Sequence, residues 1–129
     1  MAIKVTSVPA RLAETLVVDT SADTTGSGSG DNIFTGVTKA DRFYCWKIDN
    51  SAVNSVTYVK VQAATSYTLT SPPDWRFYVP ANGLVTYVFP DGQTFSNGIS
   101  FIATSTAASS NASQTAPTKS VVVTVLGGT

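Results

Sequence analysis

The stretch of sequence that decides the fold is Trp75–Phe89, WRFYVPANGLVTYVF. Aromatic and β-branched residues fill the segments on either side of Pro80–Gly83, which is the composition of β-strands. The second segment alternates regularly from Leu84 to Val88, so that successive side chains fall on opposite faces. Proline presets the entry to a turn, and an Asn-Gly pair tolerates positive φ. We therefore predict a β-hairpin here.

Strand patterns also cover most of the remaining chain, and no segment shows a convincing helical period. Because both faces of Phe43–Asp49 carry apolar residues, we expect this strand to be central in its sheet. We place Lys60 at the rim of its sheet, where a long stem can reach water, and a turn at Pro90–Gly92. The other predicted strands are Ile3–Val8, Glu14–Asp19, Val56–Ala63, Ile99–Ala103 and Ser120–Leu126.

These elements predict an all-β fold with about eight strands in one antiparallel β-sandwich, jelly-roll-like, with a barrel as the alternative. The length of 129 residues favours a single domain spanning residues 1–129. Two connections are long: a flexible Ser/Gly loop at 20–32 and a polar loop at 104–119. The segment with Pro72 and Pro73 fits a connection between sheets.

The charge of the chain is unusually low. Charged residues make up 12% of the sequence, about half the common share of roughly 25%, and eight basic residues balance eight acidic ones. A surface built from Thr, Ser, Asn and Gln gives little protection against self-association when the net charge is zero. We therefore expect the chain to form homo-oligomers.

The residue inventory excludes several functions. Without histidine, a Ser-His-Asp or Cys-His catalytic site is impossible and the usual zinc ligands are missing. Cys45 is the only cysteine, so no intramolecular disulfide forms and we expect a small apolar role for it. Balanced charge argues against nucleic acid, and no apolar run reaches the length of a membrane span. The N-terminus shows no signal-peptide pattern.

Candidates for catalysis and metal binding are weak. Glu14 is the only glutamate, and most aspartates stand beside turn residues, so we predict no enzyme activity and no cofactor. The spacing of Asp19, Asp23 and Asp31 matches no calcium motif, and we predict no metal site. The aromatic residues form either core or a sugar-stacking platform, and strand alternation favours core; they are Tyr44, Trp46, Tyr58, Trp75, Phe77 and Tyr78.

About half of the chain, residues 43 to 104, carries a more specific pattern. It comprises an aromatic strand ending in IDNSA, then YVKV, PPDW, YVPANG, PDG, FSNGIS and a final Ala103-Thr104. This pattern resembles small β-sandwich structural proteins of tailed-bacteriophage virions, in which a Pro-Ala-Gly-type turn and a Gly-x-x-Phe-x-x-Gly-Ile segment recur. The N-terminal third departs from it. These motifs concern turns and core, so the resemblance implies fold and lineage and carries no enzyme residues.

The resemblance implies a non-enzymatic virion protein, first of all a capsid decoration or cement protein. Its partners would be copies of itself and the major capsid protein, with neither nucleic acid nor membrane. Terminal Val-rich strands can complete the sheet edge of a neighbour. We therefore expect subunit contacts from Ala2–Val8 and Val121–Thr129, with Val121, Val123 and Val125 as contact residues.

Two other functions remain open at this point. The first alternative is a tail- or fibre-associated module that binds a host-surface glycan through exposed Trp75 or Trp46. The second is an enzyme, which would need at least two acids converging in a cleft.

Overall fold

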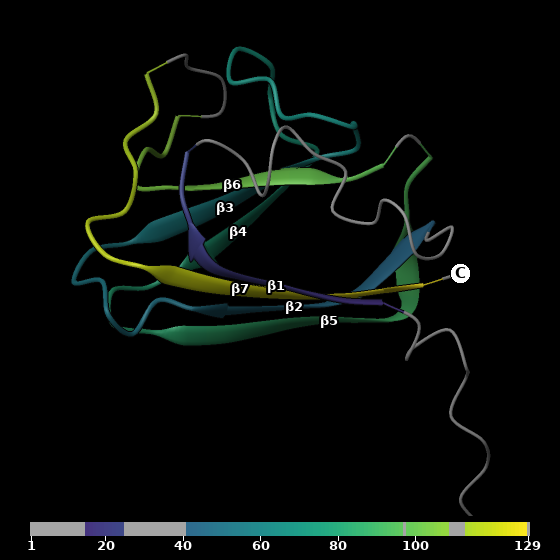
Figure 1. Cartoon of the computed structure of the whole chain (residues 1–129), viewed down its shortest axis with the longest axis horizontal. Coiled ribbons are helices and arrows are strands. Elements are labelled where there is room, and N and C mark those ends of the chain that lie inside the picture. Colours follow the sequence, from purple (N-terminus) through teal and green to yellow (C-terminus); the bar gives the residue numbers. More distant parts are fainter. Residues whose placement is uncertain (1–14, 25–40, 97, 109–112, 129) are drawn as a thin grey trace, which may run out of the picture.

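The computed structural model describes residues 15–24, 41–96, 98–108 and 113–128, and within them it contains strands and no helix (Figure 1). This confirms the all-β prediction. The predicted strand Ile3–Val8 lies outside the described residues. The seven strands are β1 (Thr15–Ala22), β2 (Arg42–Asp49), β3 (Thr57–Gln62), β4 (Trp75–Val79), β5 (Leu84–Thr94), β6 (Ser100–Thr104) and β7 (Val121–Gly128).

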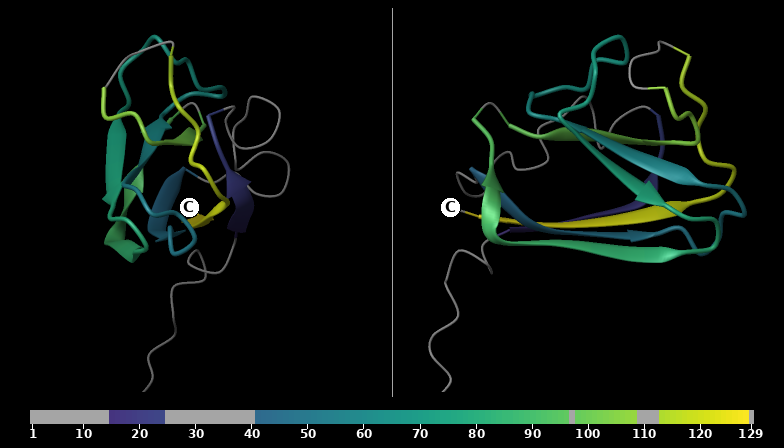
Figure 2. Two further views of the ribbon diagram at one scale, coloured as in Figure 1. Left: turned by 90° about the vertical axis from the view of Figure 1, so that its left-hand side faces the viewer. Right: turned by 180° about the vertical axis from the view of Figure 1, so that it is seen from behind.

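The strands form two antiparallel sheets that pack as a sandwich (Figure 2). One sheet has four strands in the order β1-β7-β2-β5, and the other has three in the order β4-β3-β6. As predicted, β2 is central, because it pairs with β7 on one side and with β5 on the other. The barrel alternative is wrong, since the described strands form two separate sheets.

The strand order matches a jelly roll. In that fold eight strands form an antiparallel ribbon that rolls up, pairing the first strand with the last, the third with the sixth and the fourth with the fifth. The ladders β1·β7, β2·β5 and β3·β4 are these three pairs, and β2·β7 and β3·β6 are the contacts made by rolling. The second strand of a jelly roll falls between β1 and β2, where residues 25–40 lie outside the described part.

The predicted hairpin is wrong, although its turn is present. The Gly83 N–H donates to the Pro80 carbonyl at 3.1 Å, and Asn82 has a φ of 55°. However, β4 pairs with β3 and β5 pairs with β2, so the turn connects the two sheets. The strands face each other across the sandwich, where the Tyr87 hydroxyl donates to the Tyr78 carbonyl at 2.7 Å. Alternation of side chains identifies a half-buried strand but not the strand with which it pairs. The local pattern therefore could not predict that β4 and β5 belong to different sheets.

The predicted turn at Pro90–Gly92 is also wrong, because these residues lie inside β5. Val88 pairs with Cys45 and Gln93 pairs with Phe43, so four residues of β5 stand opposite a single residue of β2. This arrangement is a large bulge, which bends the strand and keeps it in the same sheet. Pro90 is tolerated because β5 is an edge strand, where a missing N–H breaks no ladder.

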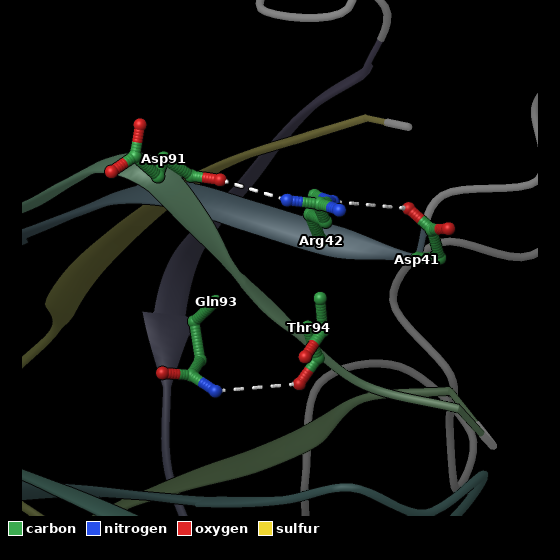
Figure 3. A network of polar contacts seen from close by, with 5 residues as sticks. All are labelled: Asp41, Arg42, Asp91, Gln93 and Thr94. Atoms are coloured by element: carbon green, nitrogen blue, oxygen red, sulfur yellow. Dashed lines mark hydrogen bonds and ion pairs between the residues drawn. The ribbon is translucent and has the colours of Figure 1, made fainter.

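Gly92 and Arg42 hold the bulge in place, and Figure 3 shows the contacts of Arg42. Gly92 has a φ of +78°, which confirms the predicted need for glycine. Arg42 donates from Nη1 to the Asp91 carbonyl at 3.0 Å, and its Nε lies 4.0 Å from an Asp41 carboxylate oxygen. A Cβ atom at Gly92 would lie 2.8 Å from Cε1 of Tyr44, closer than real contacts allow.

The long connections differ in part from their predicted bounds. Residues 20–22 continue β1, since Ala22 pairs with Val121 beyond a bulge, and residues 25–32 lie outside the described part. The second connection begins after Thr104, the last residue of β6. Its described residues, 105–108 and 113–120, contain no strand.

We predict that Gly92→Ala destabilises the fold by about 2 kcal/mol, because alanine is strained at this φ and its Cβ would clash with Tyr44. Urea unfolding followed by tryptophan fluorescence measures the change. Asn82→Gly is the matched control, since it also lies at positive φ but removes a Cβ, and its effect should stay within about 0.5 kcal/mol. Equal stabilities of Gly92→Ala and the parent would contradict the structural role of the bulge.

Candidate functional site

The valines expected to contact neighbouring subunits are core residues. Val121, Val123 and Val125 are fully buried, and β7 lies between β1 and β2 with both of its edges paired. The prediction that Val121–Thr129 completes the sheet of a neighbour is therefore wrong, and removing this segment would remove a central strand. The other predicted contact segment, Ala2–Val8, lies outside the described residues.

The two tryptophans also belong to the core. Trp46 is fully buried, and its ring lies 5.3 Å from Phe77 and 5.4 Å from Phe101 between centroids. The prediction that Trp46 contacts a glycan is therefore wrong. Trp75 is half-buried and packs edge-on against Phe43 at 5.0 Å, so it presents only part of its ring to solvent. For both, the core alternative of the sequence analysis is confirmed.

Loops cover most of the outer face of β3 and β6 in the three-stranded sheet. Lys60, Gln62, Ser100, Ile102 and Thr104 point away from the sandwich core, yet all five are buried. The connection at 63–74 and described residues of the connection at 105–120 lie over this face, on the side away from the four-stranded sheet (Figures 1 and 2). The outer side chains of β3 and β6 thus hold the loops, whereas Arg76 and Tyr78 on the outer side of β4 stay exposed.

Gln62 holds the first of these loops. Its Nε2 donates to the carbonyls of Thr68 at 3.0 Å and Ser71 at 3.1 Å, while its Oε1 accepts the N–H of Thr68 at 2.8 Å. A carboxylate oxygen of Asp74 accepts the Ala63 N–H at 2.8 Å at the end of the loop. The side-chain amide thus replaces a strand partner for several loop backbone groups.

Lys60 holds the second loop. It is fully buried, and its ammonium donates to the Ala108 carbonyl and, at 3.1 Å, to Oε1 of Gln114. Burial lowers the pKa of Lys60, and the neighbouring Arg76 guanidinium lowers it further. The predicted rim position of Lys60 is therefore wrong: the loop comes over the sheet and encloses the side chain.

Beside Lys60 lie half-buried Tyr58 and exposed Arg76 and Tyr78, a group that we call the tyrosine patch. The two tyrosine rings are 5.9 Å apart between centroids in an edge arrangement, and Tyr78 is 52% exposed. The Arg76 guanidinium lies 5.8 Å from the Tyr58 ring centroid and donates to the Ala107 carbonyl at 2.9 Å. The patch therefore combines aromatic edges with a fixed positive charge.

The outer face of the four-stranded sheet has no such covering loop among the described residues. Alternation along β2 places Cys45, Lys47 and Asp49 on this side, because Trp46 and Ile48 are buried in the core. The partners across β5 and β7 share the face. We call this surface the outer sheet face. Each of its rows runs from β5 across β2 to β7, and the three rows are Val88, Cys45 and Leu126; Thr86, Lys47 and Thr124; and Leu84, Asp49 and Val122. Val18 of β1 lies beside Thr124.

Groups for metal or acid–base chemistry do not gather in the part of the chain that the structure describes. No three Cys, Asp or Glu side chains there lie close enough to hold a metal ion. The described residues include no helix that is long and apolar enough to cross a membrane. The features that the structure does bring together are two surfaces, the tyrosine patch and the outer sheet face. In the sequence, Tyr58 and Tyr78 stand among six candidate aromatic residues, and the outer sheet face was not predicted.

We predict that Lys60→Met destabilises the fold by about 2 kcal/mol, because the Ala108 carbonyl and the Gln114 side chain lose a charged donor inside the protein. Limited proteolysis should also cut within 105–120 earlier than in the parent chain. Lys47→Met is the control, since Lys47 is exposed, and its effect should stay within about 0.5 kcal/mol. Unchanged cleavage in Lys60→Met would show that this lysine does not hold the loop.

The chain was compared with known proteins in three ways. No protein-family model matches it. No curated protein matches it either, and no solved structure does. The function is therefore inferred from the fold and the two surfaces.

Proposed function

We propose that this chain is a non-enzymatic structural protein of a bacteriophage virion, and specifically a capsid decoration or cement protein. The observation that carries the proposal is the strand order, β1-β7-β2-β5 facing β4-β3-β6, which matches a jelly roll. Viral capsid proteins are among the classes that use this fold repeatedly. This support is fold analogy, and it agrees with the resemblance carried by residues 43 to 104.

The geometry suits a protein that works by contact. Buried side chains of β3 anchor two loops, so the surface above the three-stranded sheet is held in one shape. Preorganised surfaces lose less entropy on binding. On the opposite side, the outer sheet face offers broad, weakly charged contact area. A cement protein needs such area to bridge neighbouring capsid subunits.

The test is to look for the chain in particles. Antibodies against the purified chain are applied to density-gradient fractions of phage particles from a culture that encodes it, before and after the coding region is deleted. We expect the chain to co-sediment with filled heads, and particles without it to release DNA at lower temperature. A chain confined to the soluble fractions would overturn the proposal, and presence only on isolated tails would favour the alternative below.

A specific observation favours a second candidate, a tail- or fibre-associated module that binds a host-surface glycan. The tyrosine patch pairs aromatic rings with Arg76, and Tyr78 is 52% exposed. Sugars bind to such surfaces by stacking on aromatic rings and by hydrogen bonding to polar groups. Lectins also use jelly rolls. In this reading the contacts are Tyr58 and Tyr78 instead of Trp46 or Trp75.

For this candidate we predict that Tyr78→Ala lowers glycan binding on an array at least about tenfold, because half of the aromatic platform is lost. Val88→Ala is the matched control, since Val88 is exposed on the other sheet and should leave binding unchanged. Absence of reproducible binding by the parent chain would remove the candidate.

A further inference from the structure

We propose that the tyrosine patch selects acidic glycans: the Arg76 guanidinium binds the carboxylate of a uronic or sialic acid, in a glycan that lies against Tyr78. This inference rests on the glycan-binding candidate above and names the class of sugar that this candidate would take. It is independent of the proposed role in the capsid.

The pairing of β3 with β4 places the groups of the patch on one face. Tyr58 stands opposite Tyr78, and Lys60 stands opposite Arg76 in the next row of outward side chains. Tyr78 and Arg76 are two positions apart on β4, which is about 7 Å along a strand. A sugar ring on Tyr78 can therefore place its own carboxylate, or that of the next residue of a glycan, at Arg76.

Arg76 is held in position with one edge of its guanidinium free. Its Nη1 donates to the Ala107 carbonyl at 2.9 Å, and its guanidinium carbon lies 5.8 Å from the centroid of the Tyr58 ring. Its Nε and Nη2 have no hydrogen-bond partner in the described part of the chain. These two atoms present parallel N–H groups that match the two oxygens of a carboxylate. An arginine held this way loses less entropy on binding.

A second positive charge lies beside Arg76 without an acidic partner. Lys60 is fully buried, and the acceptors of its ammonium are the Ala108 carbonyl and the Gln114 side-chain carbonyl, both of which are neutral. Burial lowers the pKa of Lys60, and the charge of Arg76 lowers it further, so the two cations repel each other. An anion bound at Arg76 would relieve this repulsion.

The acid that precedes Arg76 on the chain, Asp74, is engaged elsewhere. Its carboxylate accepts the Ala63 N–H at 2.8 Å. Burial and, to a smaller extent, the charge of Asp74 raise the pKa of Tyr67 to about 12, so this carboxylate acts on the loop at 63–74. Among the described residues Arg76 forms no ion pair. The positive charge of the patch is therefore left for a ligand.

The accessible donors suit a carboxylated sugar better than a sugar phosphate. Of the two cations, only Arg76 is exposed, and one planar guanidinium matches a carboxylate in both charge and shape. A phosphate monoester carries nearly two charges and three acceptor oxygens, which call for further accessible cations. The hydroxyls of Tyr58 and Tyr78 have no hydrogen-bond partner among the described residues, so they remain for sugar hydroxyls.

The experiment compares probes that differ in charge. The parent chain is titrated by calorimetry with tetragalacturonate and with its methyl ester, and in a second pair with sialyllactose and with lactose. At about 20 mM salt the acidic member of each pair should bind at least about tenfold more tightly. This preference should shrink at about 500 mM salt, because ions screen an exposed charge.

Variants assign the preference to Arg76. Arg76→Met should bind the acidic and neutral members of each pair alike, and Arg76→Lys, which keeps the charge but loses the planar donor pair, should keep only part of the preference. Lys47→Met is the matched control, because it removes one exposed positive charge from the opposite sheet and should keep the full preference. Arg76→Met also loses the Ala107 contact, so urea unfolding followed by tryptophan fluorescence checks its fold.

The outcomes separate this inference from the candidate on which it rests. Equal binding of acidic and neutral probes by the parent, with both lost in Tyr78→Ala, would overturn the acid preference and leave the glycan candidate standing. An acid preference that Arg76→Met retains would also overturn it, as would tighter binding of mannose 6-phosphate than of either carboxylated probe. Absence of binding to every probe would remove the inference and the candidate together.

Discussion

The aromatic contacts of Phe43 and Trp46 hold the two sheets together. Phe43 on β2 meets Trp75 of the opposite sheet edge-on at 5.0 Å, and Trp46 meets Phe77 and Phe101 at 5.3 and 5.4 Å. The Phe43–Trp75 and Trp46–Phe101 pairs pack edge-on, which places the positive ring edge on the negative ring face and adds to the free energy of burial, whereas the Trp46–Phe77 pair is tilted by 39°. Trp46 Nε1 is buried without a hydrogen-bond partner among the described residues, a cost that the ring packing must exceed.

Buried polar side chains hold the loops in place, as the aromatic rings hold the two sheets together. Asn50 is fully buried and donates to the carbonyls of Ser55 and Pro80, each at 3.0 Å, while Thr57 donates to its Oδ1 at 2.7 Å. These bonds fix the turn that carries the chain from β4 to β5. Together with Lys60 and Gln62, they give irregular segments defined partners, and a satisfied buried network favours one arrangement over others.

The low charge of the chain has a structural counterpart. Polar residues such as Thr57 and Gln62 are consumed inside the molecule, and the exposed side of the four-stranded sheet carries valine, leucine and threonine with a single Lys–Asp couple. Most soluble proteins protect such faces and edges with charge. A subunit that packs against copies or against a larger particle can leave this protection out. The low charge thus agrees with the proposed role of the chain in a particle.

The period of two along the chain was enough to locate the strands, because alternation of buried and exposed side chains is a local property. Phe43–Asp49 and Trp75–Val79 were placed to within one residue. The period of two did not determine which strands pair. A strand after a tight turn can pair with the preceding strand or cross to the other sheet with the same alternation. Only the folded chain puts β5 beside β2 and a loop over Lys60. Partner choice and burial depend on contacts between residues far apart in sequence, and these contacts define both candidate surfaces.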